Sequence, residues 1–246
     1  MCEPKPIFSP QKEKRKMKVV VLFSGGASAV PFMLGSDDFE VVGAISSSKN
    51  ASGVEKLKKL GIPVEVVDIK EFYAGRPISD MKVRSEYEEK LIQIIKEKKW
   101  NPDLIACSGY MYVLTPRFLR EFPNRVLNVH PADLSITEGG KRKYTGLHAV
   151  KAQIEAGEKA TRSTIHIMNE TPDHGPIVVI SPPLPVEGRS PEEQQNLMKE
   201  KCDGPAYRKA LELISRGMVA IDCEGNVYIM KNGKWEKGFV RMEGEH

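Results

Sequence analysis

Cysteine is scarce in this 246-residue chain, and its four copies lie far apart, at positions 2, 107, 202 and 223. No two of them have the C-x-x-C spacing of a zinc or redox site, and the five histidines do not cluster with them. We therefore expect neither a disulfide framework nor a metal site.

Long apolar runs are also missing from the sequence. No stretch approaches the roughly 18 to 20 apolar residues that span a bilayer, and the N-terminus lacks the apolar segment of a secretory signal. These absences predict a cytoplasmic protein without a membrane partner. Residues 1–17 are expected to form a disordered basic tail, and residues 18–246 a single domain.

A basic excess is absent from most of the chain. The first 18 residues hold six basic and two acidic side chains, which accounts for the whole formal net charge of +4. Domains that bind nucleic acid usually carry basic excess, because neutralising phosphates dominates their affinity. We therefore expect small-molecule substrates and no nucleic acid. The sequence does not set the oligomeric state, and a homodimer is left open.

What the sequence does contain is a regular alternation of apolar runs with amphipathic segments. Runs rich in β-branched residues predict strands, and segments with helical periodicity or end signals predict helices. The strands fall at 18–26, 39–48, 62–69, 102–110 and 125–129, and the helices at 52–61 and 79–100. This order predicts a doubly wound, mainly parallel α/β sheet of Rossmann-like type. A C-terminal β-hairpin is expected with its turn at 224–226.

Polar and glycine-rich residues follow several of these strands. Ligands of doubly wound sheets bind at the carboxyl ends of the strands. After the first strand, the sequence SGGASAV offers backbone N–H groups that can hold an anion, although it is neither a G-x-G-x-x-G nor a Walker motif. The alternative is a tight turn that needs glycine only for its backbone angles.

A second polar group is the sequence NVHP. Asn128 and His130 are two residues apart, so on a strand both side chains project from one face, and Pro131 ends the strand. An amide can stabilise a developing oxyanion, and an imidazole can add charge or move a proton. Asp173, in the turn TPDHGP, is a candidate partner for His130. His166 alternates with apolar residues and is either structural or part of the same cleft.

The stretches SGGASAV, LNVHP, YTGLHAVKAQIEAGE and STIHIM followed by TPDHGPIVV, in this order, resemble the formyltransferases that use 10-formyltetrahydrofolate, of the phosphoribosylglycinamide formyltransferase type. The resemblance covers about residues 18–229. It implies transfer of a formyl group from 10-formyltetrahydrofolate to the amine of glycinamide ribonucleotide in purine biosynthesis. It implies that Asn128 and His130 stabilise the tetrahedral oxyanion, while Asp173 supports His130 and proton transfer.

The resemblance also implies three sets of binding residues. These are Gly26, Ala27, Ser28 and Ala29 for the substrate phosphate, Met111, Tyr112, Val113 and Leu114 for the folate pterin, and Asp203 for the amine-bearing part of the substrate. The chain departs from the family pattern in four places. Two asparagines are missing from the glycine loop, His174 stands inside the usual Asp-Gly-Gly-Pro turn, Tyr112 replaces a commonly basic residue, and the loop 135–144 is longer than usual.

Three alternatives remain open. The acceptor is another amine, such as an amino sugar nucleotide; the enzyme hydrolyses formyltetrahydrofolate; or the chain is a non-catalytic phosphate- or nucleotide-binding module on the same fold. The basic residues 141–143 of the long loop are predicted either to close over an anionic ligand or to lie in solvent.

Overall fold

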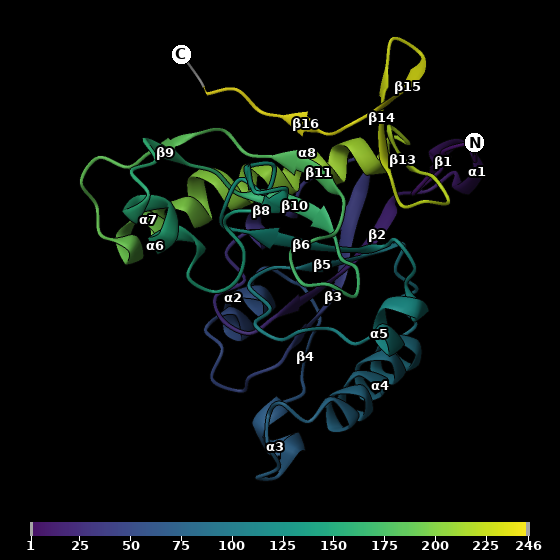
Figure 1. The fold of residues 1–246 in the computed structure, drawn as a ribbon. Coiled ribbons are helices and arrows are strands. Elements are labelled where there is room, and N and C mark those ends of the chain that lie inside the picture. The colour runs from purple at the N-terminus through teal and green to yellow at the C-terminus, as the bar shows by residue number, and fades with distance from the viewer. Residues whose placement is uncertain (1, 245–246) are drawn as a thin grey trace.

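One eight-stranded sheet forms the centre of the computed structural model, which describes residues 2–244 (Figure 1). In spatial order the strands are β16 (Val240–Arg241), β11 (Ile177–Ile180), β10 (Thr164–Ile167), β6 (Val126–His130), β5 (Leu104–Cys107), β2 (Met17–Phe23), β3 (Phe39–Ser46) and β4 (Val64–Val66). The strands from β4 to β6 run parallel, and β10 is antiparallel to both its neighbours. The predicted doubly wound, mainly parallel α/β fold is confirmed.

Helices cover both faces of this sheet, and β2 shows why. Its odd-numbered residues Val19, Val21 and Phe23 pack in one core cluster, and its even-numbered Val20 and Leu22 pack in another. Successive strand residues point to opposite faces, so a continuous apolar run requires cover on both sides. The covering helices are α8 (Gly204–Ser215) and α2 (Gly53–Lys59) on the first face, and α4 (Met81–Glu97) and α5 (Pro116–Glu121) on the second.

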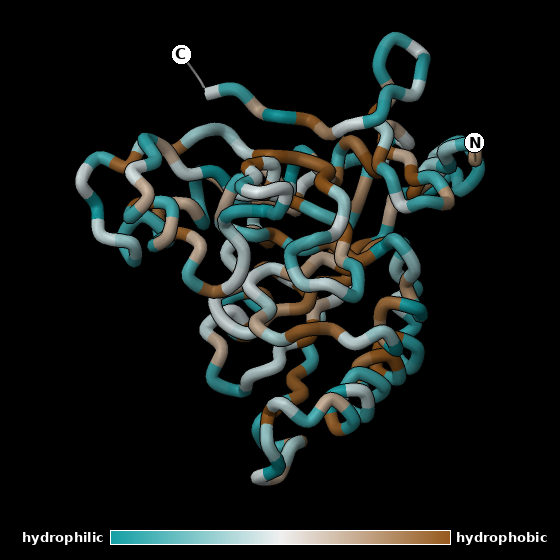
Figure 2. The backbone as a smooth tube through the Cα atoms, viewed as in Figure 1, coloured by the Kyte–Doolittle hydropathy of each residue, from teal (hydrophilic) through white to brown (hydrophobic). Residues whose placement is uncertain are grey.

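Figure 2 shows the same layering in the hydropathy of the chain: brown segments gather in the central strands, and teal segments lie mainly at the periphery. The remaining helices are α3 (Ile69–Tyr73), α6 (Ala149–Glu155), α7 (Pro191–Met198), the 3₁₀ helix η1 (Val30–Met33) and the π-helix η2 (Lys199–Asp203). The Ser190–Glu193 capping box at the start of α7 is formed as the sequence indicates. Across residues 2–244, no helix is both long and apolar enough to cross a bilayer.

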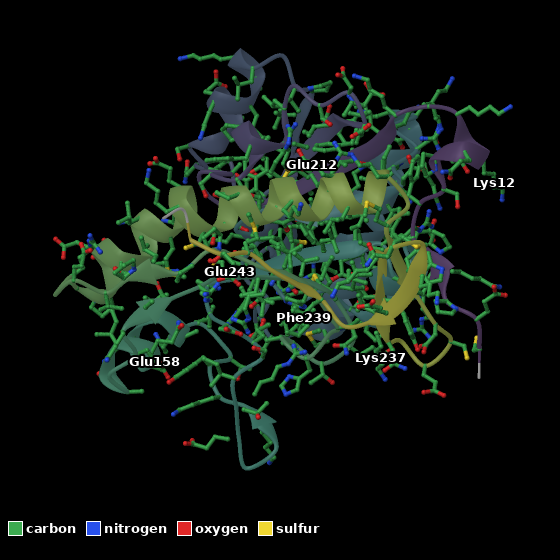
Figure 3. All side chains as sticks on the ribbon, turned by 90° about the horizontal axis from the view of Figure 1, so that it is seen from above. Lys12, Glu158, Glu212, Lys237, Phe239 and Glu243 are labelled. Atoms are coloured by element: carbon green, nitrogen blue, oxygen red, sulfur yellow. The ribbon has the colours of Figure 1, made fainter. Side chains whose placement is uncertain are left out.

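A second sheet lies beside the first and contains the predicted C-terminal hairpin. The hairpin joins β13 (Val219–Ile221) to β14 (Val227–Lys231), and β15 (Lys234–Lys237) extends it. The carboxylate of Asp222 accepts hydrogen bonds from the backbone of Glu224 and Asn226, which fixes the turn. Figure 3, seen from above, shows the C-terminal segment with Phe239 and Glu243 running alongside α8.

The prediction of a disordered tail at 1–17 is wrong for the described residues 2–17; Met1 lies outside them. Strand β1 (Lys5–Pro6) pairs with β13, and Phe8 is buried in the core. The helical turn α1 (Pro10–Glu13) follows, and Arg15 forms a bidentate pair with Asp103. The high share of lysines favours solvation, but the burial of Phe8 and the pairing of Lys5 and Pro6 with a distant strand outweigh that composition.

The chain reverses its direction of winding at β2. From β2 the chain proceeds to β3 on one side, and it later returns to β5 on the other side of β2. The connections that leave β2 and β5 therefore run in opposite directions, which makes this position a topological switch point. The two loops are joined by hydrogen bonds, since Ser24 N–H donates to Gly109 O (3.1 Å) and Met111 N–H donates to Ser24 Oγ (3.0 Å). Strand β6 lies next to β5 and parallel to it, so its carboxyl end is at the same edge of the sheet.

Candidate active site

The end of β6 presents the two predicted polar side chains, and the antiparallel register with β10 supplies a third. Asn128 lies directly opposite His166 in the ladder. Asn128 Nδ2 is 3.3 Å from His166 Nε2, and His166 Nδ1 lies 3.3 Å from Ile167 O. These partners assign the Nδ1–H tautomer, in which Nε2 accepts one N–H of Asn128. The amide is thereby oriented, and its other N–H remains available to a substrate oxygen.

His166 keeps this acceptor role because it is neutral. Burial lowers the pKa of His166 to about 4, and the nearby charge of Asp173 only partly offsets the effect of burial. An imidazole that stays uncharged at neutral pH retains its Nε2 lone pair. His166 therefore belongs to the site, and it acts on Asn128 rather than on a ligand directly.

His130 is buried and held at both ring nitrogens. Nδ1 lies 3.3 Å from Asp173 Oδ1, and Nε2 lies 2.8 Å from the backbone oxygen of Tyr144. Both partners are acceptors, so the arrangement fits an imidazolium that donates from each nitrogen. A cation held beside the amide of Asn128 can stabilise an oxyanion that forms between them.

Asp173 occupies a strained backbone position in the turn before β11. The N–H of His174 donates to Thr171 O (3.1 Å), and Asp173 has φ 59°. Pro172 at the second position and positive φ at the third are features of a type II turn, which usually places glycine or asparagine there. A non-glycine residue in this region costs about 1 kcal/mol or more, so the surroundings must hold it.

Two groups, His130 and the N–H of Gly146, fix the carboxylate of Asp173. Burial would raise its pKa, but the hydrogen bond and charge of His130, together with the N–H of Gly146 (2.8 Å from Oδ2), outweigh burial and lower the pKa to about 2. Asp173 is therefore an anion at every physiological pH, as a partner of an imidazolium must be. The structure brings together Asn128, His130 and Asp173, which the sequence singled out from separate motifs.

The long loop after His130 forms the hairpin β7 (Thr137–Glu138) and β8 (Lys141–Arg142). Arg142 turns inward: one Nη donates to Asp173 O, and the other donates to Gly175 O at 2.9 Å. Its guanidinium is therefore not available to close over a ligand. The prediction that residues 141–143 close over an anionic ligand is wrong for Arg142. Lys143 pairs with Glu138 (3.5 Å), while Lys141 is exposed.

The glycine loop lies at the switch point. Only the four-residue η1 follows it. Ala27 has φ 47°, and within residues 2–244 the backbone N–H groups from Gly25 to Ser28 donate no hydrogen bond. The N–H of Ala29 faces Ser108 Oγ at 3.4 Å. Consecutive free N–H groups in a turn form a concave anion-binding site without a long helix.

The segment after β5 is supported by a buried arginine that the sequence did not single out. Arg84 of α4 is buried; it donates to Val113 O (3.0 Å), and its guanidinium lies 4.9 Å from the ring centre of Tyr112. Met111 and Val113 are exposed, whereas the Leu114 side chain is buried in the core, so only the backbone of Leu114 can face a ligand. A hollow of about 410 Å³ lies beside this segment, lined by Tyr112, Tyr73, Lys70, Arg76, Gly75 and Ile78.

Asp203 ends the π-helix η2, and the start of α8 brings it to the same edge of the sheet. Tyr207 of α8 donates to the backbone oxygens of Cys107 (2.6 Å) and Leu127 (3.3 Å), and Gly204 packs against the ring of Phe32 in η1. Ser163 Oγ donates to Asp203 Oδ1 at 2.5 Å. Burial raises the pKa of Asp203 to about 6, although Ser163, Lys199 and His130 oppose the shift.

This raised pKa predicts a pH-dependent cost of folding. The unfolded carboxyl group has a pKa near 3.8, so between about pH 4 and pH 6 the folded state binds the extra proton, and stability falls as the pH rises through that window. Asp203→Asn should therefore stabilise the protein by about 2 to 3 kcal/mol at pH 8 and by little at pH 4. Urea unfolding at the two pH values measures the difference. Glu200→Gln, an exposed neighbour, is the control, and an Asp203→Asn effect that is equal at both pH values would contradict the assignment.

Comparisons with known proteins show the family to which this fold belongs. Residues 17–203 match the family described as formyl transferase. The chain therefore belongs to the formyl transferase family.

Several similar proteins have related names. The phosphoribosylglycinamide formyltransferase of Haemophilus influenzae is 30% identical over 167 residues, covering 66% of this chain and 70% of the relative. The chloroplastic enzyme of the same name from Arabidopsis thaliana is 33% identical over 186 residues, covering 74% and 60%. The trifunctional purine biosynthetic protein adenosine-3 of Drosophila melanogaster is 29% identical over 218 residues, but the matched part covers 86% of this chain and only 15% of that protein.

Solved structures agree with the fold. The glycinamide ribonucleotide transformylase 1 of Symbiobacterium toebii is 25% identical with a TM-score of 0.71, covering 88% of this chain and 95% of that one. The phosphoribosylglycinamide formyltransferase of Coxiella burnetii, solved with CHES, has a TM-score of 0.75 at 22% identity, covering 93% and 100%, and supports the fold alone.

Proposed function

We propose that this chain transfers the formyl group of 10-formyltetrahydrofolate to the amine of glycinamide ribonucleotide, a step of purine biosynthesis. The observation that carries the proposal is the end of β6, where Asn128 is held by His166 and His130 is paired with Asp173. An oriented amide, an imidazolium and its carboxylate partner are what acyl transfer to an amine requires. The names of the relatives favour this donor and this acceptor.

In the proposed reaction, the lone pair of the substrate amine attacks the formyl carbon and a new C–N bond forms. The carbonyl oxygen becomes an oxyanion, stabilised by the free N–H of Asn128 and the positive charge of His130. The amine then loses a proton, the bond from the formyl carbon to N10 of the folate breaks, and N10 is protonated. Asp173 pairs with His130 and is placed to assist the proton transfer through water.

The glycine loop is the proposed phosphate site. Gly26, Ala27 and Ser28 contribute free N–H groups, and Ala29 anchors the end of the loop at Ser108. Backbone donors can replace the asparagines that the family pattern has in this loop. Asp203, on the neighbouring edge, is the proposed contact for the amine-bearing part of the substrate; above about pH 6 it is the anion that such a group needs.

The proposed folate site is the segment 111–114. Exposed Met111 and Val113 offer apolar surface, and Tyr112 offers a ring face held by Arg84. Lys70 and Arg76 give the adjoining hollow a positive charge, which suits the carboxylates at the far end of a folate. Tyr112 with Arg84 behind it thus supplies both a flat surface and a nearby cation where the family has a basic residue.

The proposal predicts acceptor-dependent turnover. Purified protein would be mixed with 10-formyltetrahydrofolate or its dideaza analogue, with and without glycinamide ribonucleotide, and the donor absorbance followed. Consumption of the donor only with acceptor supports the assignment. Consumption without acceptor indicates a hydrolase, and consumption only with an amino sugar nucleotide indicates another amine. Binding of the ligands without any consumption would leave a non-catalytic binding module.

A cytoplasmic location and a homodimer are further parts of the proposal. One relative is named as chloroplastic, so the location of this chain needs a direct test. Fractionation of cells with an antibody to the native protein tests the first, and light scattering of the purified chain at several concentrations tests the second.

A further inference from the structure

The hairpin β7–β8 and the residues that follow it contact the active site at three positions. Arg142 contacts the turn of Asp173, Tyr144 O accepts from His130, and the N–H of Gly146 donates to Asp173 Oδ2. One side-chain contact and two backbone contacts thus place residues 142–146 along the pair of His130 and Asp173. The loop that lengthens this chain relative to the family pattern is thus built into the site.

The hairpin is held firmly enough to position these contacts. Its two turn residues, Gly139 and Gly140, have φ 58° and 78°, as the two-residue turns that match the twist of paired strands require. Lys143 N–H donates to Ile136 O at 3.0 Å. At the base, Arg241 of β16 donates to Asp133 Oδ2 (2.6 Å) and to Ser135 Oγ (2.7 Å).

Arg142 is suited to hold the backbone of the turn. Its planar guanidinium donates to the carbonyl oxygens of Asp173 and Gly175, which are two residues apart. Two parallel N–H groups fix the orientation of the group they bind more strictly than a single donor does. Both carboxylate oxygens of Asp173 have other partners, Oδ1 with His130 and Oδ2 with Gly146. Arg142 therefore restrains the strained turn while the carboxylate remains paired with His130.

We propose that Arg142 is a positioning residue of the transfer reaction: it acts through the Asp173 turn, and the hairpin is a fixed part of the active site rather than a lid over ligand. The proposal rests on the proposed function for its kinetic consequence. Its structural part, that Arg142 restrains the turn, stands apart from the identity of the acceptor.

The test compares Arg142→Met, Arg142→Lys and the matched control Lys141→Met, which removes an exposed charge from the same hairpin. Arg142→Met should lower kcat by about 10- to 100-fold with both KM values within about threefold, because the catalytic carboxylate is displaced and the substrates are still bound. Arg142→Lys, which offers one point of contact in place of a fork, should fall between. Lys141→Met should match the wild type.

A second measurement does not depend on turnover. Hydrogen exchange of the Gly146 amide, which donates to Asp173 Oδ2, should be about tenfold faster in Arg142→Met and unchanged in Lys141→Met. Thermal unfolding of each variant separates this local loosening from global destabilisation.

Three results for Arg142 would contradict the proposal: a kcat of Arg142→Met equal to that of Lys141→Met, unchanged Gly146 exchange in Arg142→Met, or no recovery of kcat in Arg142→Lys. A fourth contradicting result is the one that a lid predicts. In that case Lys141→Met would raise the KM of an anionic substrate, while Arg142→Met would keep a normal kcat. If the wild type shows no acceptor-dependent turnover, the proposed function fails instead. The exchange measurement then still decides whether Arg142 restrains the turn.

Discussion

Replacement of Asp173 by asparagine should lower kcat by roughly 10³-fold and leave the KM values nearly unchanged. The amide has almost the same shape, so the turn and the substrate sites should persist. The charge is lost, however, and with it the partner that lies 3.3 Å from His130 Nδ1. Without that anion, His130 loses the hydrogen-bond and charge partner that holds it beside the forming oxyanion.

Steady-state rates of the purified variant with saturating donor and acceptor measure this loss. Glu170→Gln makes the same change of charge on an exposed residue of the same loop and should behave as the wild type. A normal kcat in Asp173→Asn would remove Asp173 from the catalytic group and would also remove the reason for its strained backbone.

Gly175→Ala should destabilise the protein by roughly 4 kcal/mol or more, the range reached when an added atom has no room to enter. A Cβ at this position would lie 1.7 Å from the backbone oxygen of Ile167 and 2.9 Å from its carbonyl carbon. Backbone on a central strand cannot move aside, because β10 is paired on both edges.

Urea unfolding of the variant tests this prediction. Gly244→Ala is the control, since its Cβ would make only ordinary contact at 3.7 Å, and its stability should stay within about 0.5 kcal/mol of the wild type. A small loss in Gly175→Ala would mean that β10 and the catalytic turn can separate.

The same geometry explains a departure from the family pattern: His174 is exposed and has no positive φ, so a side chain is tolerated there, whereas the glycine at 175 is retained.

The strands could be predicted from local periodicity, and so could the position of Asn128 and His130 on the same face of one strand. Apolar runs such as that of β2 read as buried strands, and residues two apart on a strand share a face whatever the rest of the fold does. Asp173 could be singled out from turn chemistry, although its distance from His130 could not be derived from local sequence.

The contacts that complete the site could not be predicted, because they depend on the path of loops and on backbone atoms. Nothing local in the sequence distinguishes Arg142, which turns inward, from Lys141, which does not. Tyr144 contributes its carbonyl oxygen to His130, and Gly146 its N–H to Asp173, so neither side-chain type gives a signal. Arg84 reads as one more polar position on an amphipathic helix, yet it is buried under Tyr112.

The pairing of β1 with β13 also constrains how the chain can be made. Lys5 pairs with Ile221, which leaves the ribosome about 200 residues later. At a synthesis rate of about 5 to 20 residues per second, the first strand therefore has no partner for roughly 10 to 40 seconds. During that time Phe8, buried in the finished protein, has no core to enter. The lysines around it, which gave the segment the composition of a solvated tail, would keep the waiting segment from associating with other nascent chains.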